Sequence, residues 1–184
     1  WPTSTQALGR VLTATVIQGS FYDGDQTITV RIDGGGPTGK IITFADANGH
    51  VRGYIENTKV NMIYDKGAKK DQSAVGQAVG TDGFIHITKD LQIRNMFTGS
   101  APLQTGEIAE DFTYFFAKSE QIPSSVGLGV VVETDNSVKL AGGFILQVMP
   151  GCKKEDLDRI EKVIKEKIVD QQKHQIIYNF ELLK

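Results

Sequence analysis

The sequence has one cysteine, Cys152, in 184 residues. A single cysteine excludes a disulfide within the chain and any zinc site built from several of its own cysteines. Basic residues are not in excess: 20 Lys and Arg against 22 Asp and Glu leave a net charge of −2, with no basic footprint for nucleic acid. No apolar run approaches the roughly 18 residues of a membrane helix. These absences favour a cytoplasmic protein with no nucleic-acid and no membrane partner.

The chain also lacks an initiator Met and a secretion leader, and it opens with "WPTSTQALGR". From this opening we expect a piece of a longer protein. What is present suits one domain, because 184 residues with 40% hydrophobic and 23% charged side chains can bury a sizeable core.

Residues 3–21 are predicted to form a buried helix. After a Pro-Thr-Ser start suited to capping, apolar side chains surround the helix almost completely, and the strongly polar interruptions are Gln6, Arg10 and Gln18. Gly9 keeps the helix slim, so we expect it to pack against neighbours on two sides.

From Gln26 the hydrophobic period changes to that of strands. "QTITVRID" places Ile28, Val30 and Ile32 on one face, and "KIITFADANGHVRGYIEN" reads as two strands around an Asn-Gly turn. "KVNMIYDKG" is predicted to extend the sheet, and "DGFIHITKD" to add another strand.

The second half repeats this mixture. Residues 107–118 are predicted to form a helix, with aromatic residues at helical spacing. Glu107, Glu110 and Asp111 fall in its first turns, where the helix dipole favours acids. Residues 127–149 read as a long hairpin turning at Asp135-Asn136, and residues 153–168 as an amphipathic helix. The final stretch, "VDQQKHQIIYNFELLK", has weak periodicity. We therefore predict an α+β fold in which two β-sheets pack around buried helices, in β/α/β layers, followed by an amphipathic linker helix.

The stretch "RIDGGGPTGKIITF" matches two nucleotide motifs at once. A phosphate cradle at Gly34–Lys40 would need a helix directly after the loop, and strand-forming Ile41, Ile42 and Thr43 follow instead. The favoured interpretation is a structural turn with positive φ angles, and a phosphate-ligand enzyme is the distant alternative. The turn residues are Gly34, Gly35, Gly36, Pro37 and Gly39.

No catalytic constellation is found. The three histidines are far apart in sequence, and Glu110 and Asp111 are adjacent, so they point in different directions on a helix. Cys152 precedes a charged helix, where its thiol could be reactive, but an incidental loop cysteine is favoured. We expect no enzyme activity, no cofactor or metal in this chain, and no nucleotide.

Several stretches in order resemble the heat shock protein 33 family. They are "GGGPTGKI", "ADANGHVRGYIEN", "AVGTDGFIHITKDL", "GEIAEDFTYFFAKSEQIPSSVGLGVVV" and "LAGGFILQVMPG", and the opening "WPTSTQALGRVLTATV" is similar to that family's first long helix. The resemblance implies an ATP-independent holdase chaperone that captures unfolded client proteins in the bacterial cytoplasm under oxidative and heat stress. A homodimer is the other partner it implies.

The resemblance also implies parts that this sequence does not contain. Family members have an earlier strand and a C-terminal domain whose four cysteines bind zinc and form disulfides on oxidation, which makes the chaperone redox-regulated. On this basis residues 1–151 form the chaperone N-terminal domain without its first strand, and residues 152–184 the start of a helical linker and an uncertain tail. The main alternative function is an inert structural or dimerisation body.

Two groups of residues are candidates for client binding. One is the apolar stripe of the linker-like helix, which could cover a hydrophobic patch at rest. The other is an apolar group placed in a loop, where methionine suits varied partners. The candidates are Leu157, Ile160, Val163 and Ile164 in the helix, and Ile93, Met96 and Phe97 in the loop.

Overall fold

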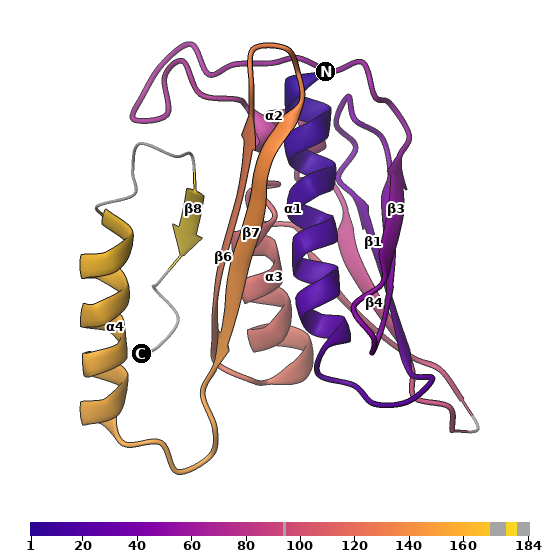
Figure 1. The fold of residues 1–184 in the computed structure, drawn as a ribbon, viewed down its shortest axis with the longest axis vertical. Coiled ribbons are helices and arrows are strands. Elements are labelled where there is room, and N and C mark those ends of the chain that lie inside the picture. The colour runs from indigo at the N-terminus through magenta and orange to yellow at the C-terminus, as the bar shows by residue number, and fades with distance from the viewer. Residues whose placement is uncertain (94, 170–175, 180–184) are drawn as a thin grey trace.

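The computed structural model describes residues 1–93, 95–169 and 176–179. Helices are interspersed with groups of consecutive strands along the chain (Figure 1). In order they are α1 (Pro2–Gly19), β1 (Thr27–Asp33), β2 (Ile41–Asp46), β3 (Val51–Ile55), α2 (Val75–Val79), β4 (Phe84–Asp90), β5 (Phe97–Pro102), α3 (Ala109–Phe115), the π-helical turn η1 (Phe116–Glu120), β6 (Ser124–Val132), β7 (Val138–Gln147), α4 (Lys154–Val169) and β8 (Ile176–Asn179).

A five-stranded antiparallel sheet has the order β3-β2-β1-β4-β5. The alternation of β1 decides which face is buried: Ile28, Val30 and Ile32 are fully buried, and Arg31 between them is exposed. The predicted hairpin of β2 and β3 around Asn48-Gly49 is confirmed.

A second, three-stranded sheet has the order β7-β6-β8. Its central strand β6 is buried over most of its length, and Val126, Leu128 and Val130 belong to the core. The predicted hairpin of β6 and β7 is confirmed, with a register shift at Val131/Val132.

α1 lies between the two sheets, as Figure 1 shows with β6 and β7 on one side and β1, β3 and β4 on the other. A Cβ on Gly9 would lie 2.8 Å from Cγ2 of Val130, and a Cβ on Gly19 would lie 2.7 Å from the Asp46 carbonyl oxygen. The helix therefore approaches both sheets at its glycines. The predicted α+β fold with helices between two sheets is confirmed.

Several local predictions were wrong. Residues 59–67 form no strand and contribute one isolated bridge, Ile63 to Ser73. The predicted helix at 107–118 starts later, at Ala109, because Ile108 has a φ of 76° and cannot belong to the helix. α2, β5 and β8 were not anticipated. Phe97, which we expected in a loop, is the first residue of β5.

β8 comes from the stretch predicted to be an uncertain tail. It pairs antiparallel with β6, with Gly127 opposite Tyr178. A segment of the tail therefore joins the sheet of the predicted N-terminal domain. Residues 170–175 and 180–184 of that tail lie outside the described residues.

Candidate binding surfaces

The glycine loop connects β1 to β2 and packs against the carboxyl end of α2. The Gly36 N–H donates to the Val79 carbonyl (2.9 Å), and the Thr38 N–H donates to the Ala78 carbonyl (2.9 Å). A Cβ on Gly36 would lie 2.4 Å from the Ala78 carbonyl oxygen, which is closer than a real Cβ can come. The loop therefore needs glycine for contact with another backbone.

The same contacts occupy the groups that a phosphate would need. A phosphate cradle presents free backbone N–H groups at a helix N-terminus, whereas these N–H groups meet carbonyls at a helix C-terminus. Gly35 and Gly39 have φ angles of 71° and 63°, and the Pro37 carbonyl accepts a bond from the Asn57 side chain (3.0 Å). The arrangement is that of a tight turn packed onto α2.

A buried ionic cluster centres on Glu107, just before α3. Its Oε2 lies 2.8 Å from Nη1 of Arg10, and both side chains are 2% exposed. Its Oε1 accepts hydrogen bonds from the Tyr64 hydroxyl (2.6 Å) and from the Lys69 ammonium (3.1 Å). The cluster joins α1, the connection between β3 and α2, and the start of α3.

Burial and the neighbouring charges shift the pKa values of the residues in this cluster. Burial by itself would raise the pKa of Glu107, but the attraction of Arg10, the Tyr64 hydroxyl and Lys69 together lower the pKa below its ordinary value of 4.5. Burial, helped by the bond to Glu107, raises the pKa of Tyr64 above 10. Burial lowers the pKa of Arg10, yet a guanidinium remains protonated in proteins, so the pair is ionised at neutral pH.

Sequence reasoning missed this cluster. Arg10 was recognised as a polar interruption of an apolar helix, which was the available signal, but Glu107 was interpreted as a partner of the helix dipole. That acid is instead paired with a cation 97 residues away. Asp111, interpreted in the same way, is fully buried, and its carboxylate accepts backbone N–H groups of Gln104, Thr105 and Ile108. It caps the loop and the helix start together.

The two groups of client-binding candidates lie in different places. Ile93, Met96 and Phe97 are 61%, 66% and 52% exposed. Ile93 and Met96 lie in the connection from β4 to β5, and Phe97 is the first residue of β5. This connection is on the opposite side of the molecule from α4 (Figure 1). The structure does not bring the two groups together.

α4 is amphipathic and incompletely covered. Leu157 and Ile160 are half-buried and Val163 is 48% exposed, while the side chain of Ile164 lies outside the described residues. Figure 1 shows α4 at the margin of the molecule, beyond β8 from the β6–β7 hairpin. Cys152, in the turn before α4, is exposed.

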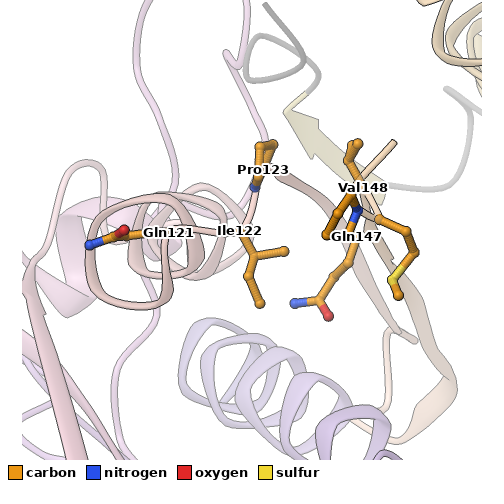
Figure 2. Close-up of a pocket in the computed structure, with 7 residues that line it drawn as sticks. Gln121, Ile122, Pro123, Gln147 and Val148 are labelled. Atoms are coloured by element: carbon orange, nitrogen blue, oxygen red, sulfur yellow. The ribbon is translucent and has the colours of Figure 1, made fainter. Parts of the chain in front are cut away.

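An apolar hollow of about 390 Å³ lies where the chain leaves η1 for β6 and where β7 ends. Figure 2 shows Ile122 and Pro123 facing Gln147 and Val148 across it. No sequence motif had pointed to this hollow. Met149, which also lines it, is 71% exposed.

Two kinds of feature are absent from the described part of the chain. No three His, Cys, Asp or Glu side chains there gather at a distance that could hold a metal ion. None of the helices described combines the length and the apolar character needed to span a membrane.

Comparison with known proteins identifies the class. The family model described as "Hsp33 protein" matches residues 1–179, and this chain belongs to that family. The 33 kDa chaperonins of Staphylococcus carnosus (strain TM300) and Staphylococcus haemolyticus (strain JCSC1435) are each 51% identical to it over 164 residues, which is 89% of this chain and 55% of the relative. The chain thus spans about half the length of these curated relatives.

A solved structure shares the fold. The crystal structure of the 33 kDa chaperonin (heat shock protein 33 homolog) from Thermotoga maritima matches with a TM-score of 0.81 and 30% identity. The match covers 96% of this chain and 66% of that chain. The family resemblance inferred from the sequence motifs is confirmed.

Proposed function

We propose that this chain is the folded body of an ATP-independent holdase, a chaperone that binds unfolded proteins without turnover. The observation that carries the proposal is membership of the Hsp33 family over residues 1–179, with relatives named chaperonins. A holdase works by presenting apolar surface to unfolded chains. Large apolar side chains exposed on this molecule, such as Met96 and Ile93, supply such surface.

Control of that surface belongs to the longer protein. We propose that a C-terminal zinc and cysteine domain regulates the full-length chaperone by redox state, as the family resemblance implies. With Cys152 as its one cysteine, this chain cannot supply a four-cysteine zinc site, so the proposal places the zinc ligands outside these 184 residues.

Within this chain, α4 is proposed to act as a partial cover. Leu157 and Ile160 on its apolar stripe are half-buried, and its first turn carries Glu155 and Asp156, which suit a helix N-terminus. A helix with few buried side chains detaches at low cost. We further propose that the protein is cytoplasmic, has no enzyme activity and binds no nucleotide. We also propose that it forms a homodimer in addition to binding client proteins.

The test is light scattering of a heat-unfolding client with the reduced chain and no nucleotide. Suppression at near-stoichiometric ratios is expected if the body is a holdase. Unchanged scattering, with the chain still folded by circular dichroism, would mean that this body is inert and that holdase activity needs the longer protein.

The loop candidates have a matched control. Ile93 and Ile63 are 61% and 62% exposed, and they lie on different connections. Ile93→Ser is expected to weaken suppression, whereas Ile63→Ser should leave it unchanged. Equal effects of the two substitutions would remove the loop from the client-binding surface.

A further inference from the structure

The strand β3 is an open edge of the five-stranded sheet. Two backbone hydrogen bonds define which of its residues form hydrogen-bonded pairs with β2. The Glu56 N–H donates to the Lys40 carbonyl (2.9 Å), and the Asp46 N–H donates to the His50 carbonyl (3.1 Å). Hydrogen-bonded and non-hydrogen-bonded pairs alternate along an antiparallel ladder. These two bonds therefore decide which β3 residues point toward β2.

Both bonds assign the same residues of β3 to hydrogen-bonded pairs with β2. Arg52 and Tyr54 direct their backbone groups to β2, where they oppose Phe44 and Ile42. The N–H and C=O groups of Val51 and Gly53 consequently point away from the sheet, and both residues are exposed. In the described part of the chain, no strand pairs with this side of β3. The edge can therefore accept another strand.

The opposite edge of the sheet is better protected. The Leu103 N–H donates to the Gly83 carbonyl (3.0 Å), which by the same alternation turns Thr98, Ser100 and Pro102 outward. Proline has no N–H to offer, and prolines on edge strands discourage the addition of a further strand. β3 carries no such residue.

Two shallow hollows follow β3 on the outer face of the sheet. One, of about 300 Å³, lies among Ile42, Phe44, Arg52 and Tyr54. The other, of about 180 Å³, is lined by Phe44, Arg52, His50, Val51 and the carboxylate-bearing Asp46. They share the Arg52 guanidinium, which stacks 4.8 Å above the centre of the Phe44 ring. In an added strand, alternate side chains on one face lie about 7 Å apart. Such a strand can place successive same-face side chains on either side of this stacked pair.

One cation on this face, the Arg52 guanidinium, has no acidic partner among the residues that the structure describes. Asp46 is engaged by His50 (2.8 Å), and Arg31 lies 3.6 Å from Asp33. An acidic side chain on an incoming strand would give the Arg52 guanidinium its partner.

We propose that β3 takes up an extended, apolar and acidic segment of an unfolded protein as an additional strand. Val51 and Gly53 would supply the backbone bonds, the two hollows would receive apolar side chains, and Arg52 would meet a carboxylate. This inference rests on the proposed holdase function and names a site for it.

The experiment measures the binding of a fluorescein-labelled peptide of alternating Val and Thr with one central Glu, by fluorescence anisotropy. Val51→Pro removes an outward N–H without removing a bond to β2, and it is expected to weaken binding about five-fold, which is the effect of one hydrogen bond. Ser100→Pro makes the same change on the opposite edge and should leave the affinity unchanged. Arg52→Glu, which leaves the backbone intact, should weaken binding of this peptide and favour its Lys counterpart.

The outcomes separate the site from the function. Slower hydrogen exchange at the Val51 and Gly53 amides with the peptide bound would support the site. If Val51→Pro and Arg52→Glu both bind the peptide like the wild type while the wild type suppresses client aggregation, the edge assignment is wrong and the holdase proposal stands. If the wild type neither binds the peptide nor suppresses aggregation, both fail. A wild-type dimer that Val51→Pro converts to a monomer, with peptide affinity unchanged, would assign the edge to a second copy of this chain and overturn the proposal.

Discussion

α3 and α4 both show apolar residues at helical spacing, yet the molecule uses them in opposite ways. α3 is the shorter helix, and its Phe112 and Phe115 side chains, which are 0% and 1% exposed, lie between the two sheets. α4 is more than twice as long and leaves Val163 48% exposed. The difference shows that length and amphipathicity do not determine burial. What distinguishes α3 is large aromatic side chains and a start held by the buried Asp111, so its cost of ordering is offset by the core.

The largest test of this comparison is Phe112→Ala. Removing a fully buried phenyl ring from between the sheets should lower the free energy of unfolding by about 4 kcal/mol, because the surroundings cannot fill the cavity. Urea denaturation followed by circular dichroism measures the change. Phe84→Ala, at 49% exposure on the outer face, is the control and should cost less than about 1 kcal/mol. Similar losses for both would contradict the assignment of α3 to the core.

Glu107→Gln breaks the ionic cluster at the start of α3. Arg10 would then be buried without a counter-charge, so we expect a loss of about 3 kcal/mol in the same denaturation experiment. A double variant, Arg10→Met with Glu107→Leu, should lose less than Glu107→Gln alone, because no charge remains buried. A double variant that is the least stable of the three would show that the pair stabilises the fold outright.

The same carboxylate predicts the response to acid. Because the pKa of Glu107 is lowered in the folded state, its contribution to stability is complete above about pH 4.5 and is lost as the pH falls through the folded-state pKa. Stability measured against pH should therefore fall more steeply at acid pH in the wild type than in Glu107→Gln. Parallel curves would place the acid sensitivity elsewhere.

Two glycine-to-alanine substitutions compare a closely packed position with an open one by adding a single methyl group. Gly36→Ala would put a Cβ 2.4 Å from the Ala78 carbonyl oxygen and should cost about 2 kcal/mol through overpacking. Gly142→Ala adds the same methyl group where nothing lies within 4 Å, and it should leave the thermal unfolding midpoint nearly unchanged. Two equally tolerated substitutions would mean that the loop does not pack closely on α2.

The smallest effect is expected in α4. Leu157→Asp places a charge on its half-buried face, and we expect the free energy of unfolding of the body to change by less than about 0.5 kcal/mol. Ile28→Asp, at a fully buried position of β1, is the opposing control and should abolish folding. A loss of several kcal/mol from Leu157→Asp would show that α4 is an integral part of the core.

By itself the sequence determined the features that rest on local chemistry. The alternation of Ile28, Val30 and Ile32 fixed the buried face of β1, the Asn-Gly turn predicted the β2–β3 hairpin, and the nearly continuous apolar surface of residues 3–21 predicted a helix between layers. Strand-forming residues after the glycine loop also argued against a phosphate cradle. These signals are readable because the residues that produce them are neighbours in the chain.

Tertiary structure decided the rest. α2 has five residues, which is too short to be stable alone, so its formation depends on packing against the glycine loop and leaves no periodic signal. β5 contains Gly99 and Pro102, poor strand residues, and forms by pairing with β4. The bond between Arg10 and Glu107 spans 97 residues. A lone Arg in an apolar helix shows that a partner is needed, but only the folded chain decides which acid provides it, because that choice depends on distances that sequence separation does not encode.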